Sequence, residues 1–221
     1  MILEIDGGYS GIRFSACHFI PRHEKCSRLH GHSYIVRLRL EGDIGEEGMI
    51  MDFVVLKKAL KAMIEELDHK TLVPTASQDV KVTYDEESVE AVSCGKRYVF
   101  PRMDVTLLDV PNTTAEEMAK MMTLRLVADV EFPSNVRTVS VGLDEERGQT
   151  AWYTEVLRCR RPSSCSPEGW IPRLAWHRPW RTAARSQPSA SGTARGTPGS
   201  WIPRRPCATS TTWTTWSSTS I

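Results

Sequence analysis

The feature that most constrains the fold is an alternating run of residues with two histidines at its start. In residues 33–40, SYIVRLRL, apolar side chains alternate with two arginines. This period of two is typical of a half-buried β-strand. His30 and His32 lie two residues apart just before the run. A strand that begins at these histidines projects both imidazoles from the same face.

A second extended segment lies a few residues upstream. In residues 13–18, RFSACH, His18 shares a face with Phe14 and Ala16. If the two strands are neighbours, three imidazoles can reach one ion. Three protein ligands leave the fourth position of tetrahedral zinc open, as in catalytic zinc sites. We therefore predict that His18, His30 and His32 hold Zn²⁺.

The role of Cys26, four residues before His30, stays open at this point. Its thiol can be a nucleophile or base beside the metal. It can equally be a fourth ligand that closes a structural site, which would make the domain a non-catalytic, zinc-stabilised module. Cys17 should point away from His18, and we expect it to be a buried, inert thiol.

The charge distribution divides the chain near residue 158. Residues 1–158 carry 19 basic and 26 acidic side chains, whereas residues 159–221 carry nine arginines and one glutamate. No run of 18 apolar residues is present, and Glu4 and Asp6 interrupt the first apolar stretch. Neither a membrane span nor a signal peptide is therefore indicated. Six cysteines without a framework spacing fit a reduced, cytoplasmic protein.

Residues 159–221 are rich in Arg, Ser, Thr and Pro and hold six of the seven tryptophans, without a helical or strand period. An arm that binds nucleic acid would have such a composition. A frameshift near residue 158 of a GC-rich gene would give the same mixture. In that case the whole chain could be the inactive product of a broken gene. We favour the frameshift origin, or at least a disordered tail without function, over the nucleic-acid arm, and expect no specific nucleic-acid partner.

Two helices are predicted within residues 1–158. Asp52 is a candidate N-cap for a helix with an apolar stripe from Phe53 to Leu67. Thr114 and Glu117 form a capping-box pattern at the start of the second helix.

Strands surround these helices. Residues 139–143 and 151–156 alternate as an antiparallel pair, and residues 80–100 predict an inserted hairpin. The order strand, strand, helix, insertion, helix, strand, strand indicates an α+β domain over residues 1–158.

These motifs, in this order, resemble the 6-pyruvoyltetrahydropterin synthase family over about residues 10–156. The resemblance rests on residues 14–18 (FSACH), 26–34 (CSRLHGHSY), 48–53 (GMIMDF), 67–69 (LDH) and 114–116 (TAE), with a weaker match at 141–145 (VGLDE). The short spacing from the cysteine to HGH is most similar to the 6-carboxytetrahydropterin synthase branch, which serves queuosine and archaeosine synthesis.

The resemblance implies a tunnelling fold, or T-fold: an antiparallel sheet with two helices on one face. Several subunits, a hexamer by resemblance, complete a barrel and form active sites between them. It implies a zinc-dependent lyase that converts 7,8-dihydroneopterin triphosphate to 6-carboxy-5,6,7,8-tetrahydropterin, releasing triphosphate and acetaldehyde. The alternative within the family is a 6-pyruvoyltetrahydropterin synthase, which shares substrate and metal but usually has a longer cysteine-to-histidine spacing.

The resemblance also implies a role for three residues in proton transfer. Cys26 would be the base, and His69 with Asp68 would relay its proton. Taken alone, Asp68 and His69 stand at the end of a predicted helix, where a histidine simply complements the helix dipole.

The remaining roles concern the pterin. Glu145 matches the glutamate that holds the N–C–N edge of the ring through two hydrogen bonds. Three acids follow one another here, Asp144, Glu145 and Glu146, so the register is open between Glu145 and Glu146. Thr113 and Thr114 resemble residues that line the pterin pocket.

Overall fold

The computed structural model describes residues 1–146 and 148–157. The elements in chain order are β1 (Ile2–Ile5), α1 (Gly7–Ser10), β2 (Arg13–His18), β3 (His30–Gly42), α2 (Phe53–Glu65), β4 (Lys70–Pro74), β5 (Val80–Tyr84), β6 (Ser88–Ser93), β7 (Lys96–Pro101), the 3₁₀ helix η1 (Arg102–Asp104), β8 (Val105–Leu108), α3 (Ala115–Asp129), β9 (Val136–Glu146) and β10 (Gln149–Val156). The tail predicted for residues 159–221 lies outside the described residues. Among the helices that are described, none is long and apolar enough to cross a membrane.

The main sheet has seven strands in the order β10-β9-β3-β2-β4-β8, with β1 beside β3. Its pairs from β10 to β2, and the β1–β3 pair, are antiparallel, which confirms the predicted α+β arrangement around the histidines. The pairs β2–β4 and β4–β8 are parallel. Helix α2 carries the chain back along the sheet between β3 and β4, and the insertion β5–β7 with η1 does so between β4 and β8.

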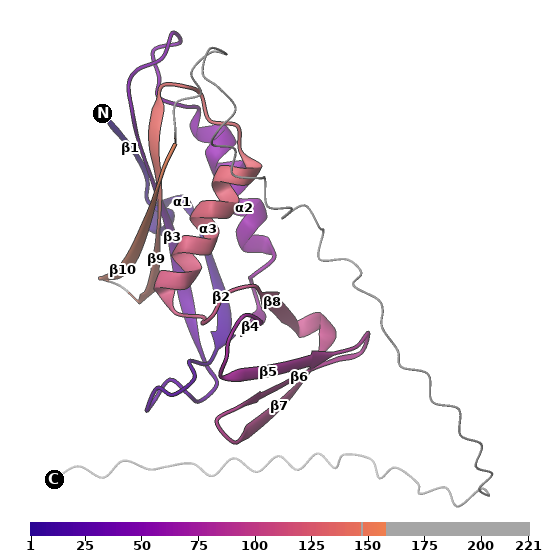
Figure 1. The fold of residues 1–221 in the computed structure, drawn as a ribbon. Coiled ribbons are helices and arrows are strands. Elements are labelled where there is room, and N and C mark those ends of the chain that lie inside the picture. The colour runs from indigo at the N-terminus through magenta and orange to yellow at the C-terminus, as the bar shows by residue number, and fades with distance from the viewer. Residues whose placement is uncertain (147, 158–221) are drawn as a thin grey trace, which may run out of the picture. The chain divides into compact units, whose positions relative to one another are not determined.

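Helices α2 and α3 pack on one face of this sheet (Figure 1). Asp52 caps α2 by accepting a hydrogen bond from the Val54 N–H at 2.8 Å, and Thr114 caps α3 by accepting one from the Glu117 N–H at 3.5 Å, both as predicted. The predicted apolar stripe of α2 is buried at Leu56, Leu60, Met63, Ile64 and Leu67. Phe53, which begins the helix, instead remains 47% exposed.

The alternation predicted for residues 33–40 determines which face of β3 contributes to the hydrophobic core. Val36, Leu38 and Leu40 are fully buried under the helices, whereas Arg37 and Arg39 project from the other face. Burial of such side chains contributes roughly 1.5–3 kcal/mol each. The packing therefore fixes the register of β3, and with it the face on which the histidines lie.

The insertion forms a separate three-stranded antiparallel sheet, β5-β6-β7 (Figure 1). The segment predicted as a hairpin thus has a third strand, which begins after a turn at Cys94 and Gly95, both with positive φ. Val89 and Ala91 of β6 pack with Phe19, the residue after β2. The ring of Phe19 also stacks on Tyr98 of β7, with centroids 5.1 Å apart. The small sheet therefore packs against the segment that follows His18.

Candidate metal centre and active site

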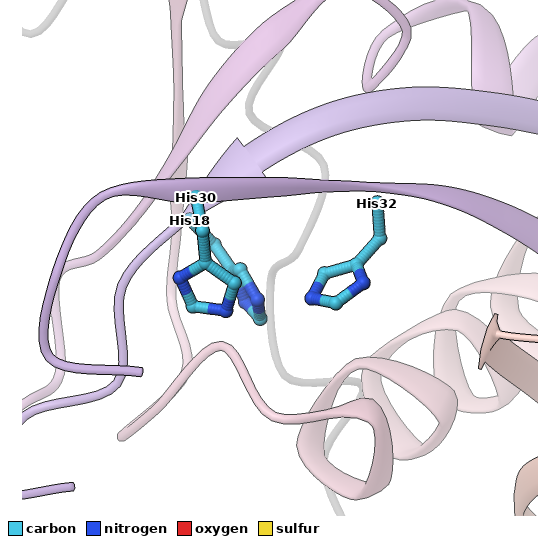
Figure 2. A group of neighbouring side chains, drawn as sticks. All are labelled: His18, His30 and His32. Carbon is cyan, nitrogen blue, oxygen red and sulfur yellow. The ribbon is translucent and has the colours of Figure 1, made fainter. Parts of the chain in front are cut away.

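The three histidines predicted as ligands come together at one end of β2 and β3. His18 pairs with His30 across the two strands, and Ala16 pairs with His32. All three imidazoles project to the same side (Figure 2). One nitrogen from each ring lies within 4.8 Å of the others, a spacing at which the three could hold one metal ion. We call His18, His30 and His32 the histidine cluster.

Main-chain carbonyls orient two of these rings. The Nδ1 of His18 lies 2.8 Å from the Thr113 carbonyl oxygen, and the Nδ1 of His30 lies 2.7 Å from that of Arg28. A carbonyl oxygen only accepts, so each Nδ1 carries the proton and each Nε2 keeps its lone pair. Both Nε2 atoms are buried without a hydrogen-bond partner. Such orphaned acceptors, oriented by a second partner, fit a metal site.

The electrostatics of His18 favour the neutral form that binds metals. Burial lowers the pKa of His18 from 6.5 to about 4, opposed by the Thr113 carbonyl and assisted by His30 and His32. The ring is therefore uncharged at neutral pH, and no proton has to leave before it can coordinate an ion.

Cys26 lies in the loop that leaves the sheet after His18 and returns at His30. Its carbonyl oxygen accepts from the Ile20 N–H at 2.7 Å, and its N–H donates to Nδ1 of His23 at 3.0 Å. Its side chain is half-buried. Among the described residues Cys26 is not part of the histidine cluster. This geometry gives no support to a closed site with Cys26 as the fourth ligand.

Cys17 differs from the sequence expectation. Its side chain is on the opposite face of β2 from His18, as the alternation requires, but it is exposed rather than buried. The expectation of a buried thiol fails because this whole face of β2, which also carries Arg13 and Ser15, is exposed.

Asp68 and His69 follow α2 and are tied to β2. Asp68 Oδ1 accepts from the Ser15 N–H at 2.8 Å, and the His69 N–H donates to the Ser15 carbonyl at 2.7 Å. The first of these bonds, with a smaller effect of His69, lowers the pKa of Asp68. Asp68 Oδ2 lies 2.9 Å from His69 Nδ1, and the His69 side chain is 84% exposed. The predicted pair therefore forms, but no hydrogen bond among the described residues links it to Cys26.

The three consecutive acids at the end of β9 have different surroundings. Asp144 is buried on the face away from the histidines, where it accepts from Arg37 Nε at 3.0 Å and Thr150 Oγ1 at 2.6 Å. Glu146 is exposed. Glu145 is close enough to Tyr34, which lies beside the histidines, for its charge to act on that hydroxyl, and its Oε1 is buried without a hydrogen-bond partner. The geometry therefore favours Glu145 over Glu146 as the carboxylate of this site.

Tyr34, which the sequence analysis treated only as a strand residue, lies beside the histidine cluster. Its ring is fully buried, 5.6 Å from the His32 ring and 6.0 Å from the His18 ring by centroids. Its hydroxyl is buried without a partner, an arrangement that costs roughly 1–3 kcal/mol. Burial, and next the charge of Glu145, raises the pKa of Tyr34. The alternation that puts His30 and His32 on one face of the strand also puts Tyr34, two residues after His32, on that face, and this spacing could have identified it.

The two threonines predicted as pocket residues serve the framework. Thr113 is fully buried, and its hydroxyl donates to the Phe19 carbonyl at 3.2 Å while its own carbonyl orients His18. Thr114 uses its hydroxyl as the N-cap of α3. Both residues are therefore engaged in placing the histidine cluster and α3.

Comparisons with known proteins agree with this architecture. A Methanocaldococcus jannaschii protein, named provisionally as a 6-carboxy-5,6,7,8-tetrahydropterin synthase, is 34% identical over 164 residues, covering 72% of this chain and 100% of that protein. A protein of Pyrococcus abyssi with the same provisional name is 35% identical over 147 residues, 66% of this chain and 87% of its own length.

The fold matches a solved structure as well. The crystal structure of 6-pyruvoyl tetrahydropterin synthase from Plasmodium vivax superposes with a TM-score of 0.66 at 24% identity, over 71% of this chain and 98% of that one. The described domain therefore has the T-fold. The family model for 6-pyruvoyl tetrahydropterin synthase matches residues 9–156, and the chain belongs to this family.

Proposed function

We propose that this protein converts 7,8-dihydroneopterin triphosphate and one water molecule to 6-carboxy-5,6,7,8-tetrahydropterin, with release of triphosphate and acetaldehyde, in the synthesis of 7-deazaguanine nucleosides. The observation that carries the proposal is the histidine cluster, whose buried Nε2 atoms have no hydrogen-bond partner. The short Cys26-to-His30 spacing and the names of the archaeal relatives favour the carboxy product over the pyruvoyl product. The enzyme would be a cytoplasmic lyase.

The histidine cluster would hold one zinc ion through the three imidazoles. Bound zinc would polarise oxygens of the substrate side chain and make the adjacent C–H bonds more acidic. The chain's part is to keep His18 and His30 in the tautomer that presents Nε2, which the Thr113 and Arg28 carbonyls do. With only three protein ligands, one position stays available to substrate.

Proton transfer would fall to Cys26. Cys26 lies in the loop that joins β2 and β3, the two strands that carry the cluster, and we propose that its thiol reaches a substrate held there. His69 would exchange the proton with Cys26, and Asp68, 2.9 Å from its Nδ1, would fix the tautomer. Because His69 is exposed, we propose that it meets the Cys26 loop of a neighbouring subunit in a homo-oligomer that closes the T-fold barrel.

Pterin recognition would rest on Glu145. A carboxylate with an unpaired, buried oxygen suits the two N–H groups of the N–C–N edge. Thr113 and Thr114 would shape the pocket from the start of α3, through their backbone and the helix end.

The test is to incubate the zinc-loaded protein with 7,8-dihydroneopterin triphosphate and to identify products by mass spectrometry. We expect 6-carboxy-5,6,7,8-tetrahydropterin, triphosphate and acetaldehyde in equal amounts. A 6-pyruvoyl product without acetaldehyde would instead establish the alternative synthase. Unchanged substrate, with zinc bound and the protein folded, would contradict both activities.

A further inference from the structure

Tyr34 and Glu145 form a pair of buried polar groups that the proposed mechanism leaves half explained. The β3–β9 ladder ends at the pair of Ile35 and Asp144, and Tyr34 and Glu145 are the next residue on each strand toward the histidines. Burial raises the pKa of the Tyr34 hydroxyl, and Glu145 is close enough for its charge to raise that pKa further. Both face the helix side of the sheet. The Tyr34 hydroxyl and Glu145 Oε1 are each buried without a hydrogen-bond partner, and no bond joins them to each other.

These two atoms belong to a row of unsatisfied groups. The row begins at Nε2 of His18 and His30 and continues past Tyr34 to Glu145. Buried polar atoms without a partner are rare, and four of them on adjacent strands indicate a site built for a ligand. The Tyr34 ring cannot turn away, because it stacks on Phe14 with centroids 4.8 Å apart.

The donors and acceptors of this pair match one edge of a pterin ring. The ring presents two N–H donors on its N–C–N edge and, next to them, the carbonyl oxygen of the pyrimidine ring. A carboxylate accepts from the two donors, and a phenol, protonated at neutral pH, can donate to the adjacent oxygen.

We propose that the Tyr34 hydroxyl contacts the substrate and donates a hydrogen bond to the carbonyl oxygen of the pterin ring held by Glu145. The inference rests on the proposed pterin substrate. It adds a recognition residue that selects rings with an acceptor beside the N–C–N edge. It also explains why an unpaired hydroxyl is kept at a buried position that phenylalanine would fill.

The experiment compares Tyr34→Phe with the wild type, both loaded with zinc. Binding of neopterin, which retains the same ring edge, is followed by its fluorescence, and unfolding of the ligand-free protein is followed by heating. We expect neopterin affinity to fall by roughly five- to tenfold, the value of one hydrogen bond. The zinc content and melting temperature of the variant should equal or exceed those of the wild type, because no protein partner is lost.

Tyr153→Phe is the matched control. The Tyr153 hydroxyl lies 3.4 Å from Glu155 on β10, and this variant should bind neopterin as the wild type does. Unchanged affinity in Tyr34→Phe would overturn the inference. So would weaker binding together with a lower melting temperature, because the hydroxyl would then support the fold.

The outcomes also separate this inference from the proposed function. A wild type that binds neopterin through Tyr34 but does not turn over dihydroneopterin triphosphate would leave the contact standing and remove the proposed reaction. A wild type that does not bind neopterin would overturn both.

Discussion

Lys96 of β7 is joined to Ser27 by two hydrogen bonds. Its Nζ donates to the Ser27 carbonyl at 2.7 Å and lies 3.0 Å from the Ser27 hydroxyl. Ser27 follows Cys26 directly, so the small sheet holds the loop that carries the proposed base. Phe19, at the start of the loop, packs on the same sheet through Tyr98. The insertion therefore positions Cys26 from outside the main sheet.

Lys96→Met should therefore reduce turnover by about tenfold or more while zinc content stays the same, because misplacement of a catalytic group by about 1 Å is enough to slow chemistry strongly. Steady-state kinetics should show the loss in kcat rather than in KM. Lys96→Arg, which can still donate to Ser27, should recover part of the rate. Lys81→Met, an exposed lysine on β5 of the same sheet, is the control; an equal loss there would contradict a specific role for Lys96.

Substitution of any member of the histidine cluster by alanine should remove the metal. Three ligands cannot lose one without a large fall in affinity, so His18→Ala, His30→Ala and His32→Ala should each purify with far less than one zinc per chain. Elemental analysis of the purified protein measures this directly. His23→Ala, which changes a histidine outside the cluster, should keep its zinc. Full zinc occupancy in two of the three cluster variants would refute the site.

The substitution Cys26→Ala should show whether Cys26 is the catalytic base or a metal ligand. The zinc content should remain at the wild-type level, because the Cys26 thiol is not grouped with the histidine nitrogens that would bind the metal. Turnover should fall by about a hundredfold or more, the usual contribution of a general base. Cys17→Ala, on the opposite face of β2, should change neither quantity. Loss of zinc from Cys26→Ala would point to the closed structural site instead.

Glu145→Gln should weaken pterin binding by about 10- to 100-fold, because the hydrogen bonds lost are to a charged group. Titration with neopterin measures the change. Glu146→Gln, which alters the exposed neighbour, should leave the affinity as it is. If the defect appeared in Glu146→Gln alone, the carboxylate would have to be reassigned by one residue.

The metal-free protein should lose stability in mild acid through His18. Its pKa in the folded state is about 4, below the unfolded value of 6.5, so the unfolded chain binds the proton first. The stabilising contribution is complete above pH 6.5 and is lost as the pH falls toward 4, by up to about 3 kcal/mol. Urea unfolding at several pH values should show this slope in the wild type and lose that part of it in His18→Leu. An identical pH dependence in both proteins would contradict the assignment.

Local sequence patterns determined most of the secondary structure and the histidine cluster. The period of two in residues 33–40 predicted β3, and the His30-x-His32 spacing placed two imidazoles on one face. The caps at Asp52 and Thr114 marked the helix starts. These features were readable because they depend on residues close together in the chain, where backbone geometry alone decides which side chains share a face.

Tertiary structure decided what depends on register between distant strands. The resemblance assigned the pterin carboxylate to Glu145 but left the register open against Glu146, and the structure shows Asp144 bound to Arg37 and Thr150, Glu146 exposed, and Glu145 with a buried, unpaired oxygen. The pairing of β3 with β9 brings Glu145 near Tyr34, and the third strand of the insertion brings Lys96 to Ser27. A shift by one residue in such a pairing reverses every side chain, and the packing of the buried face against α2 and α3 selects one register.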